Sequence, residues 1–170
     1  HLELAVKFYL YVPESANNGL ESWIGPNPQD NLSIKYKRLL QHQLPLSSTL
    51  QANTYFKENA IPLPDRRVAN VKGYLFSPLG VSASPGAPVA ENFPRGHWLK
   101  NNSLSKLEKQ FPEEPWLVID KENWLDPAPC LRNRHTVPTA RLVEGCQNLT
   151  KPRLVVNEKD SRRYFLMPES

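Results

Sequence analysis

The chain has 170 residues, of which 39% are hydrophobic and 22% are charged, and its net charge is +4. This composition is ordinary for a globular protein and argues against wholesale disorder. No run of about 18 apolar residues occurs, which excludes a membrane-spanning helix. The longest basic runs are pairs, which is not the signature of a nucleic-acid-binding tail.

Proline is the outlier of the composition, with 17 prolines against 7 glycines. Proline lacks an N–H group and fixes φ, so it ends helices and is confined to sheet edges and turns. The prolines therefore exclude a large helical bundle and predict short elements joined by stiff loops. A chain of this length usually builds one core, and residues 1–170 are expected to form a single β-rich domain.

The first predicted element is a strand at residues 2–12. Hydrophobic side chains occupy every even position of this stretch, and a period of two indicates a strand with one face in the core. Residues 13–31 are rich in Pro, Asn, Gly and Ser and are expected to form a long loop. Residues 31–44 have mixed spacing and are interpreted as a strand that runs into a turn or a short helix.

Two further strands are predicted in the next third of the chain, at residues 48–59 and 66–80. Valine and aromatic side chains in the second of these stretches favour extended backbone. A second proline-rich loop is expected at residues 81–97.

The most helical stretch covers residues 103–111. Leucines and a phenylalanine follow the spacing of one helix face, and Ser105 with Glu108 fits a capping box. Pro112 is expected to end this helix after about two turns.

The remaining predicted elements are a short strand at residues 115–120 and a closing hairpin at 153–167, with its turn around Glu158–Ser161. Together these elements predict a mainly β fold, either a β-sandwich or a partly open barrel, with α+β as the alternative. The prediction includes one short helix near residues 103–111 and long proline-rich loops.

Fifteen residues lie between the two cysteines of the chain, Cys130 and Cys146. This spacing is too long for a redox pair, and His135 would still leave a zinc site incomplete. A disulfide between them would stabilise the protein by about 3 kcal/mol in the chain-entropy picture. We therefore expect a Cys130–Cys146 disulfide, with two unpaired structural thiols or a metal site as alternatives.

Enzymatic chemistry has weak support in the sequence. An N-terminal His1 could chelate copper through its amine and ring, with His97 as the second histidine of a copper brace. Asp120 and Glu122 could supply an acid/base pair, but they fit a solvated rim better. No nucleophile elbow and no phosphate-binding loop occur. We expect no catalytic residue and no cofactor, and the sequence leans away from an enzyme.

Arginines and aromatic residues supply most of the binding energy in protein interfaces. Three tryptophans lie in polar, proline-flanked stretches, and arginines crowd the last forty residues. The residues predicted to bind a partner are Trp23, Trp98, Trp124, Arg132, Arg134, Arg141, Arg162, Arg163 and Tyr164.

The function predicted from these features is a non-enzymatic exported binding protein that recognises another protein, of a toxin-neutralising, inhibitor or secretion-accessory type. Its location is expected to be periplasmic or extracellular, with a leader assumed to have been removed. One alternative is a nucleic-acid-binding protein that uses the basic C-terminal segment. The other is a metal-dependent enzyme built on the copper brace.

Overall fold

A computed structural model describes the chain except for residues 14–18, 26, 28, 127–134 and 170. The chain divides into two compact units. The first contains His1–Gly73 and Pro85–Val89, and the second contains Tyr74–Ser84 and Ala90–Ser170. The expectation of a single domain stays a prediction.

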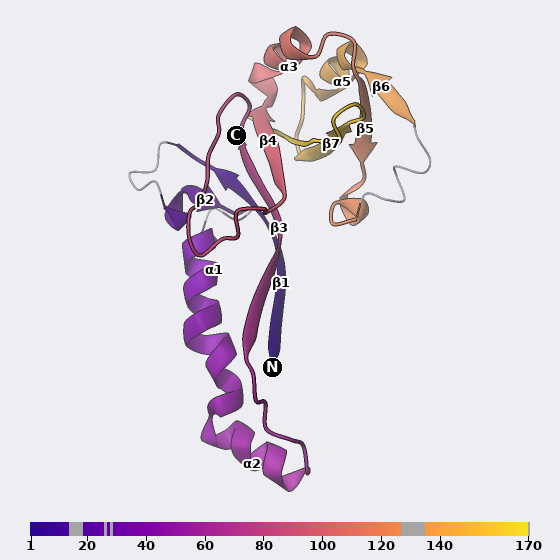
Figure 1. Ribbon diagram of the computed structural model, residues 1–170. Coiled ribbons are helices and arrows are strands. Elements are labelled where there is room, and N and C mark those ends of the chain that lie inside the picture. Colours follow the sequence, from indigo (N-terminus) through magenta and orange to yellow (C-terminus); the bar gives the residue numbers. More distant parts are fainter. Residues whose placement is uncertain (14–18, 26, 28, 127–134, 170) are drawn as a thin grey trace. The chain divides into compact units, whose positions relative to one another are not determined.

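The first unit contains a small sheet with the strand order β2-β1-β3 (Figure 1). Strand β1 is Leu2–Tyr11, β2 is Trp23–Ile24, and β3 is Val68–Pro78, which continues into the second unit. Strand β2 is antiparallel to β1, with Leu10 opposite Ile24.

A run of helical turns lies between β2 and β3 in the sequence of the first unit. Figure 1 shows it as the long column that carries the labels α1 and α2. The elements are α1 at Leu32–Arg38, a π-helical turn η2 at Leu39–Gln43, a 3-10 turn η3 at Leu44–Ser48, and α2 at Leu50–Glu58. A short 3-10 turn, η1, precedes β2 at Leu20–Ser22.

Both α-helices of this run begin at capping residues that the sequence contains. The Asn31 side chain accepts a hydrogen bond from the Ile34 N–H at 2.9 Å, and the Thr49 hydroxyl accepts one from Ala52 at 3.2 Å. Such caps satisfy backbone donors that a helix leaves free at its start. The strand predicted at residues 48–59 is therefore wrong, and so is the strand that was expected to open residues 31–44. The short helix that was expected to follow within residues 31–44 covers that stretch instead.

The core of the first unit does not follow the alternation expected along β1. Tyr9, on the face expected to be partly wet, is buried, whereas Leu2 is exposed. Trp23 packs against Tyr11 with ring centroids 5.3 Å apart, and Leu39 of the π turn is also buried. The core of this unit is therefore built on the face of β1 that carries Tyr9 and Tyr11.

The second unit contains a mixed sheet with the strand order β3-β4-β8-β7-β5-β6. Strand β4 pairs in parallel with β3 and with β8, while the other neighbours are antiparallel. The strands are β4 at Arg95–Lys100, β5 at Pro115–Ile119, β6 at Thr136–Pro138, β7 at Arg153–Asn157 and β8 at Arg163–Met167.

Helices α3, Ser105–Gln110, and α5, Thr139–Cys146, supply apolar side chains to the core of this sheet. Short 3-10 turns lie at Asn101–Ser103 (η4) and Lys121–Asn123 (η5). The buried core cluster is made of Leu99, Leu104, Leu107, Trp116, Leu142, Val143, Cys146, Val155, Tyr164 and Leu166.

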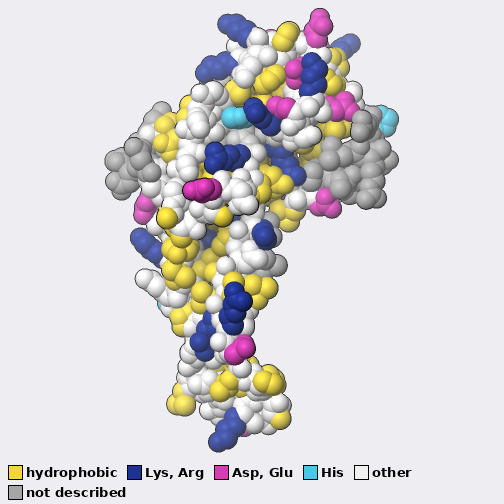
Figure 2. Space-filling view, in the orientation of Figure 1, with side chains coloured by type: hydrophobic (Ala, Val, Ile, Leu, Met, Phe, Trp, Pro, Cys, Tyr) yellow, Lys and Arg dark blue, Asp and Glu magenta, His cyan; other side chains and the backbone are white. Residues whose placement is uncertain are grey.

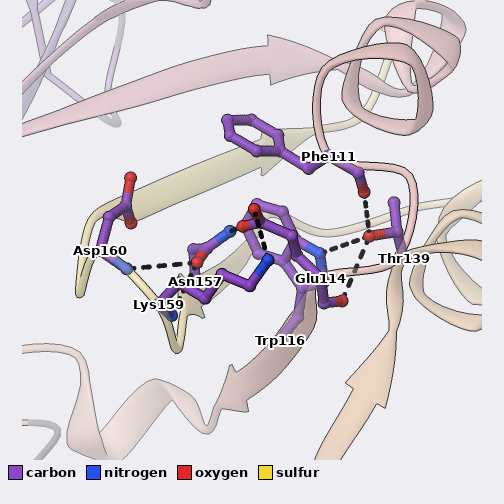
Figure 3. A network of polar contacts seen from close by, with 7 residues as sticks. All are labelled: Phe111, Glu114, Trp116, Thr139, Asn157, Lys159 and Asp160. Atoms are coloured by element: carbon purple, nitrogen blue, oxygen red, sulfur yellow. Dashed lines mark hydrogen bonds and ion pairs between the residues drawn. The ribbon is translucent and has the colours of Figure 1, made fainter.

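The turn between β7 and β8 is held by a buried asparagine (Figure 3). The Asn157 side-chain amide donates to the Glu114 carboxylate, and its oxygen accepts from the Lys159 N–H at 2.9 Å. Lys159 Nζ also lies 3.2 Å from Glu114 Oε1. The hydrogen bond from Asn157 is the main reason why the pKa of Glu114 is lowered.

Helix and strand occupy nearly equal shares of the protein, about 32% and 30%. The fold is therefore α+β, which is the alternative that the sequence analysis named, and it is not a mainly β sandwich or barrel. Helix is also not limited to the one short helix expected near residues 103–111. The strands at the start of the chain and around residues 68–78 and 115–119, the closing hairpin and helix α3 are confirmed. The long proline-rich loops stay a prediction. Among the described residues, no helix is long and apolar enough to cross a membrane.

Candidate functional site

The helical run of the first unit and the five residues that follow it, residues 32–63, expose an unusual amount of apolar surface. Twelve large hydrophobic side chains are exposed in the described part of the chain, and seven of them lie in this segment. Their exposed fractions run from 43% for Leu40 to 79% for Leu50. We call this set the apolar surface, and its members are Ile34, Leu40, Leu46, Leu50, Tyr55, Ile61 and Leu63.

Figure 2 shows hydrophobic side chains gathered over the part of the first unit that carries α1 and α2 in Figure 1. Isolated exposed leucines are normal on any protein, but a concentration of them marks a binding surface. The concentration therefore makes residues 32–63 the candidate functional site.

Helix α2 is the least supported element of this segment. None of its nine residues is buried. A helix of this length is marginal in water by itself, because most helical stability comes from packing one face against another element. The exposed α2 therefore leaves two large hydrophobic side chains, Leu50 and Tyr55, that a partner could cover.

A groove of about 660 Å³ lies along the same segment, over α1 and the π turn. Its lining combines apolar, amide and basic side chains and contains no carboxylate. No acidic residue occurs anywhere between Asn31 and Lys57. The lining residues are Ile34, Lys37, Arg38, Gln41, His42, Gln43 and Leu46.

A polar network joins the 3-10 turn η3 to the residues at the start of β1. Ser47 is buried, and its hydroxyl lies 3.0 Å from His1 Nδ1 and accepts a hydrogen bond from Arg67 Nε at 2.9 Å. The other ring nitrogen of His1 lies 2.8 Å from Glu3 Oε1. These contacts hold η3 in place against the start of β1.

Lysine side chains make two further polar contacts in this unit. Lys35 Nζ donates to Gln43 Oε1 at 3.3 Å, which bridges α1 and the π turn beside the groove. Lys7 Nζ lies 3.0 Å from Asp30 Oδ2, and this pair is partly buried.

The tryptophans predicted to bind a partner have different environments. Trp23 is buried in the first unit, so its side chain is not available to a partner. Trp98 and Trp124 are half-buried in the second unit. The Trp124 indole donates to the Ile119 carbonyl at 3.1 Å and meets the Phe165 ring edge-on at 4.9 Å.

The predicted C-terminal binding residues also lie in the second unit, and several are already paired. Tyr164 is buried, so it too is unavailable to a partner. Arg163 is half-buried with its guanidinium 3.6 Å from the centre of the Tyr74 ring. Arg141 pairs with Glu144 at 3.1 Å, and Arg162 with Asp160 at 3.5 Å. Arg132 and Arg134 lie outside the described residues.

Cys146 is buried in α5, and its sulfur accepts a hydrogen bond from Arg153 Nη1 at 3.6 Å. Burial raises the pKa of this thiol. The described part of the stretch between the two cysteines contains β6 and this helix. Cys130 lies outside the described residues, so the Cys130–Cys146 disulfide stays a prediction.

The two histidines of the predicted copper brace belong to different units. Both ring nitrogens of His1 are engaged with Ser47 and Glu3. The ring of His97 packs against Tyr164 at 5.5 Å, and burial is the main cause that lowers its pKa. Among the described residues, no three His, Cys, Asp or Glu side chains are grouped to hold a metal ion.

The sequence analysis did not identify the apolar surface. Its leucines were visible between residues 32 and 63, but leucines at such spacing fit a buried face equally well. Whether a hydrophobic side chain is buried depends on elements distant in sequence, which the local pattern does not contain. The capping residues Asn31 and Thr49 were the signals that could have revealed the helices.

A family model matches residues 1–156, and the chain belongs to that family, which is described as a domain of unknown function (DUF1853). No curated protein and no solved structure matches the chain.

Proposed function

We propose that the protein is a non-enzymatic binding protein that recognises another protein through the apolar surface of its first unit. The observation that carries the proposal is the concentration of exposed hydrophobic side chains in residues 32–63. Burial of one leucine or isoleucine side chain contributes about 1.5–3 kcal/mol. A partner that covered several of these residues would therefore gain enough to offset the cost of association.

The state of α2 supports the same proposal. A partner that packed against Leu50 or Tyr55 would give this helix an apolar contact that it lacks within the described chain.

The alternative of nucleic-acid binding through the C-terminal segment has less support. Binding to a phosphate backbone depends on cations that can replace counterions. In this segment Arg141 and Arg162 already face carboxylates, and Arg163 is half-buried against Tyr74. These pairs reduce the positive field that a nucleic acid would meet.

Export to the periplasm or the outside of the cell belongs to the same proposal. It depends on the predicted Cys130–Cys146 disulfide, because disulfides persist in oxidising compartments. If both cysteines proved to be free thiols, the proposal of export would lose its basis, whereas the proposal for the apolar surface would be unaffected.

A peptide-display selection tests the protein-binding function directly. Immobilised protein is expected to enrich a related set of peptides from a random library. The double variant Leu46→Asp, Leu50→Asp should lose that enrichment, since it places two charges on the apolar surface. Leu125→Asp is the matched control, because Leu125 is 55% exposed and lies in the second unit.

The control variant should enrich the same peptides as the unchanged protein. Circular dichroism of each variant would verify that the helices are retained. The proposal is wrong if no related peptides are enriched, or if the Leu46→Asp, Leu50→Asp variant enriches them as well as the unchanged protein does.

A further inference from the structure

The groove of the first unit has a specific chemical character that goes beyond exposed hydrophobicity. We infer that it binds an acidic amphipathic helix of a partner protein, with carboxylates over Lys37 and Arg38 and apolar side chains against Ile34 and Leu46. This inference rests on the proposed protein-binding function and specifies the class of partner.

The first step is the shape of the helical run. Ile34, Lys37, Arg38 and Gln41 follow the i, i+3, i+4, i+7 spacing of one helix face. The first three belong to α1, whereas Gln41 lies in the π turn, at whose end the Leu44 N–H bonds to the Leu39 carbonyl. Single π turns inside helices are rare and are frequent at functional sites.

The π turn changes the direction in which the side chains that follow it project from the helical run. Side chains after the turn, such as Leu46, join those of α1 in lining one groove, although they belong to a different helical element. The network of Ser47, His1 and Arg67 holds η3 in place. The groove is therefore formed before any partner arrives, which reduces the ordering cost of binding.

The second step is the charge of the groove. Lys37 and Arg38 line it, and neither forms an ion pair among the residues that the structure describes. No carboxylate lines the groove, and Glu21, whose charge interacts with Lys37, is not part of the lining, so an acidic ligand meets complementary charge in the groove.

The third step is the placement of the apolar side chains. Ile34 and Leu46 are 50% and 56% exposed, and both line the groove with the two cations. They are twelve positions apart in sequence, and at 1.5 Å per residue a helical run of that length covers roughly 18 Å. A partner helix of about three turns has the corresponding length.

These features favour a protein segment over a nucleic acid. A phosphate backbone would satisfy Lys37 and Arg38 but would leave Ile34 and Leu46 in contact with water. An amphipathic helix with carboxylates beside its apolar stripe satisfies both kinds of side chain. Recognition of this kind places an amphipathic helix in a groove with anchors one or two turns apart.

The test uses two synthetic peptides of sixteen residues with identical leucine positions on one helix face. Glutamate fills the polar positions of one peptide and lysine fills those of the other. Fluorescence anisotropy of labelled peptides with the full chain should show at least tenfold tighter binding of the glutamate peptide. Added salt should weaken that binding, because part of it is electrostatic.

Charge reversal of the groove provides the matched comparison. The variant Lys37→Glu, Arg38→Glu should bind the glutamate peptide at least tenfold more weakly than the unchanged protein does. The variant Lys106→Glu, Lys109→Glu makes the same change in net charge on exposed positions of α3 and should bind as the unchanged protein does. Thermal unfolding of each variant would verify that it remains folded.

Three results would overturn the inference. The first is equal affinity for the two peptides, and the second is equal loss of binding in both charge-reversed variants. The third is that neither peptide binds, whereas Lys37→Glu, Arg38→Glu abolishes binding of a single-stranded oligonucleotide or abolishes self-association. The oligonucleotide result would indicate a nucleic acid, and the self-association result would indicate a second copy of the chain.

The failure of this inference can be distinguished from failure of the proposed function. If the display selection enriches neutral apolar peptides that require Leu46 and Leu50, but the glutamate peptide does not bind, protein binding stands and only the acidic partner is wrong. If no peptide is enriched and neither synthetic peptide binds, both proposals are wrong.

Discussion

The indole N–H of Trp116 donates a hydrogen bond of 2.8 Å to the hydroxyl of Thr139, in the core of the second unit. Both residues are fully buried, and they join β5 to the first residue of α5. The Thr139 hydroxyl also donates to the Phe111 carbonyl, at the end of α3 (Figure 3). One hydroxyl therefore links three elements that are distant in sequence.

Replacement of Thr139 by valine is expected to destabilise the protein. Valine keeps the shape of the side chain but removes the hydroxyl, which leaves the Trp116 N–H and the Phe111 carbonyl without this partner. An unsatisfied buried polar group costs about 1–3 kcal/mol. Urea unfolding followed by tryptophan fluorescence would measure the loss.

Thr139→Ser is the control for this prediction, because serine keeps the hydroxyl and loses only a methyl group. It should lower the free energy of unfolding less than valine does. Equal losses in the two variants would show that packing of the methyl group, and not the hydrogen bond, stabilises this site.

A second prediction concerns Gly96, which lies on β4 next to Phe76. A Cβ atom on Gly96 would lie 2.5 Å from the Phe76 ring and 2.7 Å from the Arg163 carbonyl oxygen. Overpacking of this kind usually costs about 1–3 kcal/mol. Gly96→Ala should therefore lower the melting temperature measured by circular dichroism.

Gly145 offers the opposite case within the same unit. It lies inside α5, and an added Cβ there would meet nothing within 4 Å. Alanine is favoured over glycine in a helix by about 0.5–1 kcal/mol. Gly145→Ala should therefore raise the melting temperature slightly, and a fall as large as that of Gly96→Ala would contradict both steric arguments.

The sequence predicted those elements whose local pattern agrees with their final environment. The hairpin of β7 and β8 has apolar runs bounded by a turn, and α3 has apolar side chains at helical spacing. The capping box predicted at Ser105 and Glu108 is wrong, because the N-cap of α3 is Leu104 and no side chain caps it. Residues 48–59 were predicted to be a strand, and the capping signal of Thr49 was overlooked. A cap and a periodic helix face together are stronger evidence than β-propensity.

The candidate site was less predictable than the fold. Trp23 lies in a polar, proline-rich stretch that suggests an exposed side chain, yet it is buried beside Tyr11. Leu50 belongs to a hydrophobic residue type that is usually buried, yet it is 79% exposed. In both cases the outcome depends on which distant elements cover the residue, and the local sequence does not contain that information.

A third prediction concerns the pH dependence of stability. Burial, with a smaller contribution from the charge of Arg162, lowers the pKa of His97 in the folded protein below its ordinary value of 6.5. The unfolded chain therefore binds a proton more readily than the folded protein does. The stability that neutral His97 contributes is present above pH 6.5 and is lost as the pH falls through that value toward the lower folded pKa.

The variant His97→Gln isolates this contribution because glutamine does not titrate. The free energy of unfolding should fall less between pH 7.5 and pH 5.5 in the variant than in the unchanged protein. Carboxylates such as Glu114, whose pKa is lowered by Asn157, titrate in both proteins and cancel in the comparison. An identical pH dependence would show that His97 is not responsible.

The last prediction concerns the two cysteines, on which the proposal of export depends. Cys146 is buried and burial raises the pKa of its thiol, so it should resist alkylation in the folded protein whether or not it is bonded. Alkylation must therefore be done in denaturant, with and without reductant, and followed by intact mass. If Cys130 and Cys146 form a disulfide, protein made under oxidising conditions gains two labels only after reduction. If it gains two labels without reductant, the disulfide is wrong and export loses its support, whereas the apolar surface of residues 32–63 remains a candidate binding site.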